Sequence, residues 1–102
     1  MKIFLDANVL FSASNAQSNI YQFLQLLLRD HQLITSPYAF EEARRNIELK
    51  RPAWLPTLEA LKSQIILCAN TPLLVEIALV DKDRPILGAA IGAQCDYLLT
   101  GD

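Results

Sequence analysis

The sequence has 102 residues, which is the size of a single domain. Nine basic and eleven acidic residues give a net charge of −2, and hydrophobic residues make up 52% of the chain. This composition excludes an intrinsically disordered chain and a polybasic arm that binds nucleic acid mainly through its charge.

The apolar runs are too short to cross a membrane. The longest, Ile65–Ala69, is far below the roughly 20 residues that a span requires. Asp6 interrupts the N-terminal apolar run, so we expect no signal peptide. Cys68 and Cys95 lie among apolar residues, which favours buried free thiols in a reducing compartment over a disulfide. We therefore expect a cytoplasmic protein made of one domain, residues 1–102.

Four short apolar runs predict the strands of a sheet. They are Lys2–Leu5, His31–Thr35, Gln64–Cys68 and Tyr97–Leu99. Each run is continuous rather than alternating, which is typical of strands that are buried on both faces of a parallel sheet.

Helical patterns fill the gaps between these runs. The expected helices are Ser18–Arg29, one after Ser36-Pro37, one bracketed by Pro52 and Pro56 with Leu58 and Leu61, one after Thr71-Pro72, and one from Asp83 through Ile91. Serine or threonine followed by proline is typical of an N-cap and the first helical residue. Because parallel strands need crossover connections, the pattern predicts an α/β protein: a single three-layer domain with a parallel sheet of about four strands and helices on both faces.

Four acidic residues stand near the expected carboxyl ends of the strands: Asp6, Glu42, Asp83 and Asp102. Ligands of open α/β sheets bind outside these ends. Carboxylates without cysteine or histidine ligands suit Mg²⁺ or Mn²⁺. Any one of these acids taken alone is more often a turn residue or a helix cap, whereas several acids at the same strand ends favour a shared site. The residue pattern therefore leaves a metal site and a purely structural role both open.

Three blocks of the sequence resemble the PIN-domain nucleases, a family that includes many toxin ribonucleases. The block Met1–Leu10, MKIFLDANVL, resembles the N-terminal signature of the family, and Ser36–Asn46 is similar to its second acidic segment. Asp83–Ala90, followed by Asp96–Asp102, resembles the third and fourth acidic segments. The blocks occur in family order along the chain.

The resemblance implies a metal-dependent endoribonuclease, the toxin of a toxin–antitoxin pair. One or two Mg²⁺ or Mn²⁺ ions would be held by the four acids, Asp6, Glu42, Asp83 and Asp102, with Thr100 and Asn8 in support. It also implies an RNA substrate, an antitoxin partner and a homodimer, with no membrane association. The family usually continues beyond the last acidic motif, so the resemblance implies a C-terminus that lacks a strand or helix. The alternative is a catalytically inactive PIN-like module that binds RNA or protein.

Adjacent glutamates compete for the second acidic position. On a helix that starts after Ser36, Glu41 shares a face with the arginines and can pair with Arg45, as on a solvated surface. Glu42 lies on a mixed face and matches the family motif. We therefore predict Glu42 as the ligand.

A basic cluster follows these glutamates. Its members are Arg44, Arg45, Lys50 and Arg51. They form either a solvated helix face or a strip that contacts RNA phosphates. Tyr38 and Trp54 are aromatic candidates for stacking on unpaired bases, although Trp54 fits the core as well. Without the four proposed acidic ligands, the remaining charge is 9 − (11 − 4) = +2, so the net charge does not oppose an RNA partner.

Overall fold

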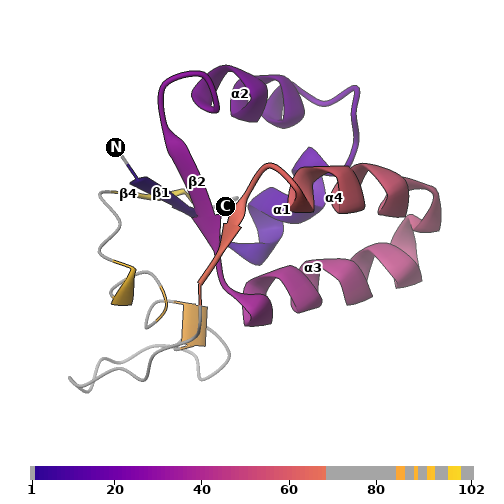
Figure 1. Cartoon of the computed structure of the whole chain (residues 1–102). Coiled ribbons are helices and arrows are strands. Elements are labelled where there is room, and N and C mark those ends of the chain that lie inside the picture. The colour runs from indigo at the N-terminus through magenta and orange to yellow at the C-terminus, as the bar shows by residue number, and fades with distance from the viewer. Residues whose placement is uncertain (1, 69–84, 87–88, 90–91, 94–96, 100–102) are drawn as a thin grey trace.

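The structure is a computed structural model, and it describes residues 2–68, 85–86, 89, 92–93 and 97–99 (Figure 1). The elements follow one another as β1 (Lys2–Leu5), α1 (Ala7–Ala13), α2 (Asn19–Leu27), β2 (Gln32–Thr35), α3 (Pro37–Lys50), the 3-10 helix η1 (Pro52–Trp54), α4 (Leu55–Lys62), β3 (Ile66–Leu67) and β4 (Tyr97–Leu99).

The four strands form one parallel sheet in the order β3-β2-β1-β4. Strand β1 is central, since Ile3 is in register with Leu33 of β2 on one side and with Tyr97 of β4 on the other. The predicted α/β class and the four parallel strands are confirmed.

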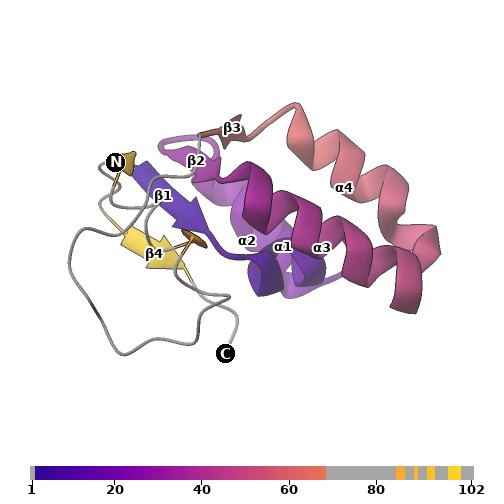
Figure 2. The ribbon, with the colours of Figure 1, turned by 90° about the horizontal axis from the view of Figure 1, so that it is seen from below.

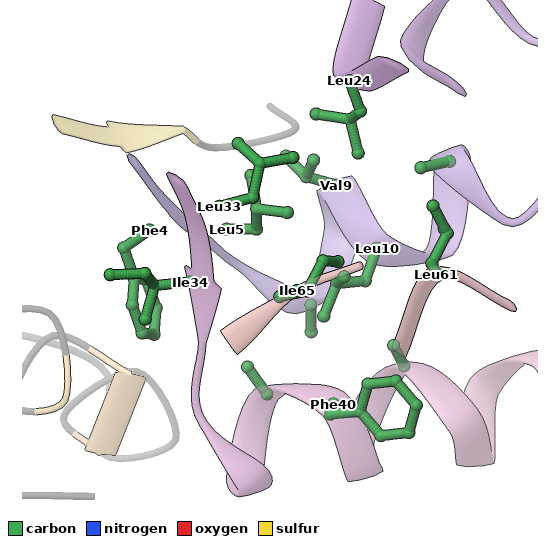
Figure 3. Close-up of a cluster of buried hydrophobic side chains, with 14 of the residues drawn as sticks. Phe4, Leu5, Val9, Leu10, Leu24, Leu33, Ile34, Phe40, Leu61 and Ile65 are labelled. Atoms are coloured by element: carbon green, nitrogen blue, oxygen red, sulfur yellow. The ribbon is translucent and has the colours of Figure 1, made fainter. Parts of the chain in front are cut away.

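The helices α1 to α4 lie together on one side of the sheet (Figure 2). Successive side chains of a strand point to opposite faces. Leu5 and Leu33 accordingly point toward α1, whereas Phe4 and Ile34 point to the other side (Figure 3). Helical residues that precede β4, including Ile86, are buried in the same core as Phe4. The domain therefore has the three layers that the sequence predicts.

Burial separates the central strands from the edge strands. The last three residues of β1 and of β2 are buried, as predicted. Ile66 of β3 is 47% exposed and Tyr97 of β4 is 59% exposed. The expectation that every strand is buried on both faces is therefore wrong for β3 and β4, because these strands form the two edges of the described sheet.

Helix α1 is the element that the sequence analysis did not anticipate. It has only seven residues, which is too short to be stable in isolation. Four of its residues, Ala7, Val9, Leu10 and Ala13, are buried. Tertiary packing rather than local propensity therefore stabilises α1.

The other described helices agree with the predicted segments, with shifted bounds. Ser18 and Ser36 cap α2 and α3, and Pro37 occupies the first turn of α3. Pro56 lies in the first turn of α4 instead of closing a helix, and Leu58 and Leu61 are the buried residues of α4. No helix within the described ranges is long and apolar enough to span a membrane.

Several expectations fall on residues beyond the described part. The helix after Thr71, most of the helix after Asp83, and Cys95 lie outside it. Cys68 is a free thiol, as predicted, but it is half-buried rather than fully buried.

Candidate functional site

The sheet topology creates a switch point at β1. The chain leaves β1 toward β2 on one side, and β4 pairs with the opposite edge of β1. In open α/β sheets the ligand crevice lies outside the carboxyl ends of the strands where the order reverses. Asp6 directly follows β1, and its backbone N–H donates to the carbonyl of Leu99, the last residue of β4, at 3.3 Å. Asp6 therefore stands at the switch point.

The carboxylate of Asp6 is held by the start of α1. Asp6 is the N-cap of this helix, and its Oδ1 accepts a hydrogen bond from the Val9 N–H at 2.9 Å. Such a contact satisfies one of the N–H groups that a helix start leaves unpaired. The helix-cap role is thus observed, and it is compatible with a ligand role because carboxylates that bind metals are usually oriented by a hydrogen bond.

A buried hydrogen bond fixes the end of the neighbouring strand. The Thr35 hydroxyl, at the end of β2, donates to the carbonyl of Leu5 at 2.8 Å. The next residue, Ser36, caps α3 by accepting from the Ala39 N–H at 2.9 Å. Both residues are fully buried. The helices α1 and α3 therefore start from two strand ends that are tied together.

Glu41 and Glu42 have different surroundings. Both oxygens of Glu41 accept from Arg44, with the Nε contact at 2.9 Å. This hydrogen bonding holds the pKa of Glu41 below its ordinary value, against the opposing effect of desolvation. Glu42 is half-buried beside the buried Ala39 and Ala43, in the second turn of α3. Glu41 belongs to a surface ion pair, which leaves Glu42 as the better candidate ligand.

The ion pairing of α3 differs from the predicted one. Glu41 pairs with Arg44, three residues on, and not with Arg45. Arg44 also contacts Glu48 at 2.9 Å. These are the two salt bridges within the described residues, so Arg45 has no ion-pair partner there. Of the predicted basic cluster, Arg44 is therefore the member whose charge is already offset.

A cation–aromatic pair lies where α3 ends and η1 begins. The guanidinium carbon of Arg51 lies 5.7 Å from the centroid of the Trp54 ring. Phe11 of α1 packs edge-on against the same indole, with centroids 5.5 Å apart and an interplanar angle of 62°. Trp54 is half-buried against the core, as is Tyr38. Core packing is thus confirmed for part of the indole.

The remaining predicted site residues are distributed as follows. Asn8 is exposed in the first turn of α1, and Lys50 is exposed at the last residue of α3. Thr100, Asp83 and Asp102 lie outside the described residues. Among the described residues, no group of three acidic, histidine or cysteine side chains is assembled for a metal.

Two positioning residues were missed by the sequence analysis. Thr35 was treated only as the end of a strand, and Phe11 was not singled out. The available signal for Thr35 was a β-branched hydroxyl residue directly before the Ser36-Pro37 helix start. The contact between Phe11 and Trp54 joins residues that are distant in the sequence, so no local pattern reveals it.

Comparisons with known proteins give structural matches but no sequence match. No family profile and no curated protein matches the chain. A chain of the VapBC2 complex from Rickettsia felis, bound to a DNA fragment from their promoter, superimposes with a TM-score of 0.73 over 100% of both chains at 15% identity. VapC20 of Mycobacterium tuberculosis, a sarcin–ricin loop cleaving toxin, superimposes with a TM-score of 0.68 over 98% of this chain and 89% of its own, at 12% identity.

Proposed function

We propose that this chain, whose fold is that of the PIN-domain toxins, is a metal-dependent endoribonuclease that hydrolyses phosphodiester bonds in RNA. The observation that carries the proposal is the place of Asp6, an oriented carboxylate at the carboxyl end of the central strand and at the switch point of the sheet. The structural relatives support the same activity, since VapC20 is an RNA-cleaving toxin.

The proposed ligands are carboxylates, which are the groups that Mg²⁺ and Mn²⁺ prefer. Asp6 and Glu42 fit this chemistry, because Asp6 is oriented by the Val9 N–H and Glu42 is half-buried on a helix that starts beside it. Asp83 and Asp102 complete the proposed set by their match to the family motif. When bound, the cation supplies activation of water and offsets the charge of the phosphodiester.

The surrounding residues would orient the site and the substrate. The hydrogen bond between Thr35 and Leu5 keeps the two strand ends at a fixed spacing, which fixes the starts of α1 and α3. Asn8 and Thr100 are proposed to position a carboxylate or a water through their polar side chains. Arg45, with Lys50 and Arg51 further along, offers unpaired positive charge to RNA phosphates.

A protein partner belongs to the same proposal. The Rickettsia felis relative is part of a VapBC2 complex on promoter DNA. By analogy, we propose that this chain is the toxin of a toxin–antitoxin pair, acts on RNA in the cytoplasm, and is held inactive by its antitoxin.

A second copy of the chain is proposed to bind through α2. Phe23 is 48% exposed and Leu26 is 57% exposed, although both are large and apolar. The helix Asn19–Leu27 contains no charged residue, and the cores of protein interfaces are depleted of charge. A neutral apolar face can meet its own copy without charge repulsion, as an isologous dimer requires.

The test is cleavage of single-stranded RNA by the purified chain. We expect cleavage in Mg²⁺ or Mn²⁺, its loss in excess chelator, and its return when the metal is restored. Cleavage that continues in chelator would overturn the metal-dependent mechanism. RNA binding without cleavage in either metal would favour the catalytically inactive binding module.

A further inference from the structure

The pair formed by Arg51 and Trp54 stands out from the site described above. The guanidinium carbon of Arg51 lies 5.7 Å from the centroid of the Trp54 ring, and Arg51 is an exposed residue. Cation–π contacts of this kind are common in proteins and do not by themselves indicate a ligand. Three further features of this corner of the molecule distinguish it.

The first feature is the rigidity of the ring. Phe11 packs edge-on against Trp54, and both residues are half-buried against the core. The indole, which η1 carries, is therefore packed against α1, with part of its surface exposed. A preorganised aromatic ring loses little conformational freedom when a base stacks beside it.

The second feature is uncompensated charge. Lys50 and Arg51 are exposed, and neither makes an ion pair within the part of the chain that the structure describes. The nearest acid in sequence, Glu48, is engaged with Arg44. Positive charge beside an aromatic ring is the combination that binds unpaired nucleic acid strands, where the cations attract phosphates and the ring stacks on a base.

The third feature is the distance from the proposed metal site. Asp6 is the N-cap of α1, Phe11 lies five residues further along this helix, and an α-helix rises about 1.5 Å per residue. The contact between Phe11 and Trp54 adds 5.5 Å between ring centroids. The helix rise and the ring contact sum to about 13 Å, and the reach of the Phe11 side chain from its Cα brings the Trp54 ring to within about 18 Å of Asp6. A stacked strand rises about 3.4 Å per nucleotide, so at most about five nucleotides bridge the two.

We infer that Arg51 and Trp54 form a stacking subsite for an unpaired base of single-stranded RNA, a few nucleotides away from the scissile phosphate. The inference rests on the proposed function, because it names the part of the same substrate that lies outside the cleavage site. The base stacks on the exposed part of the Trp54 ring beside Arg51, and Arg51 and Lys50 attract the adjoining phosphates. A base that is paired in a duplex cannot reach this subsite with its flat face.

Trp54 is the only tryptophan in the chain, so its fluorescence reports on this corner alone. The experiment uses the Asp6→Asn variant in chelator, which prevents cleavage, and titrates it with an oligoadenylate of about ten nucleotides. We expect saturable quenching of the Trp54 emission. An abasic oligonucleotide of equal length, which keeps the phosphates and lacks the bases, is expected to bind without quenching.

Variants test the contribution of each residue to affinity, measured by the anisotropy of a labelled oligoadenylate. Arg51→Ala and Trp54→Leu are each expected to weaken binding about fivefold to a hundredfold. The matched control is Lys62→Ala, which removes the cation that lies 5.3 Å from the Phe40 ring in another cation–π pair. We expect this control to retain both affinity and quenching.

The outcomes separate this inference from the proposed function. RNA binding that leaves the Trp54 emission unchanged, with equal affinity in Arg51→Ala, would overturn the stacking subsite and leave the nuclease proposal intact. The wild-type chain could instead cleave no RNA, while RNA still quenches the Trp54 emission and binds the Arg51→Ala and Trp54→Leu variants more weakly. That result would support the subsite and contradict the nuclease proposal.

Discussion

The hydroxyl of Thr35 donates a hydrogen bond of 2.8 Å to the carbonyl oxygen of Leu5, and the contact is buried between the ends of β2 and β1. Asp6 and Ser36, which follow these two residues, cap α1 and α3. A single side-chain contact therefore joins the two points from which the proposed ligands Asp6 and Glu42 are presented.

Replacing Thr35 by valine removes this hydrogen bond while retaining the shape of the side chain. We expect Thr35→Val to lower the free energy of unfolding by about 1 kcal/mol, which corresponds to a fall in Tm of about 4–8 °C for a domain of this size. Thermal unfolding followed by circular dichroism measures the change. An unchanged Tm would show that the contact does not fix the strand ends.

The cap at Asp6 gives a second prediction about stability. Asparagine and aspartate cap helices about equally well, whereas alanine lacks the acceptor. We therefore expect Asp6→Ala to lower the free energy of unfolding by about 1 kcal/mol and Asp6→Asn to leave it near that of the wild type. Denaturant unfolding compares the two variants. Equal stability of Asp6→Ala and wild type would mean that the bond to the Val9 N–H contributes nothing.

The ion pair between Arg44 and Glu41 predicts a pH dependence. Because folding lowers the pKa of Glu41, its carboxylate favours the folded chain above the unfolded-state pKa, and this contribution is lost as the pH falls through the folded-state pKa. We expect Arg44→Gln to raise the pKa of Glu41 toward its ordinary value. The free energy of unfolding should then depend less on pH in the acid range. NMR titration of the Glu41 carboxyl carbon measures the shift, and a pKa that does not move would assign the lowering to another group.

The apolar face of α2 predicts a change of oligomeric state. Phe23→Gln combined with Leu26→Gln should weaken dimerisation roughly tenfold or more, since each side chain would lose the burial of its exposed surface in the interface. Sedimentation equilibrium measures the association. Leu49→Gln, which replaces an apolar residue that is 82% exposed on α3, is the matched control and should dimerise like the wild type. A wild-type chain that is monomeric throughout would refute the α2 interface.

Continuous apolar runs and proline-marked helix starts predicted most of the fold. The runs that became β1 and β2 are buried, and Ser36-Pro37 begins α3 where the pattern placed it. The same run pattern overestimated the burial of β3, because an apolar run does not reveal whether its strand lies at the centre or at the edge of a sheet.

Short helices and distant contacts could not be predicted in the same way. Helix α1 depends on the burial of Val9 and Leu10 against other elements, which local propensity does not encode. For the candidate site, the apolar run before Asp6 was enough to place that residue at a strand end. The choice of Arg44 rather than Arg45 as the partner of Glu41 depends on side-chain geometry within α3, where both spacings are allowed.

The role of Asp6 in catalysis is tested most directly by the rate of RNA cleavage by Asp6→Asn compared with Glu41→Gln, measured in Mn²⁺ on single-stranded RNA. Asp6→Asn keeps the helix cap and removes the carboxylate charge, while Glu41→Gln removes a carboxylate from the surface ion pair. We expect cleavage to fall at least a hundredfold in Asp6→Asn, as for removal of one essential electrostatic group, and to keep the wild-type rate in Glu41→Gln. Cleavage by Asp6→Asn at the wild-type rate would refute the role of Asp6 as a metal ligand.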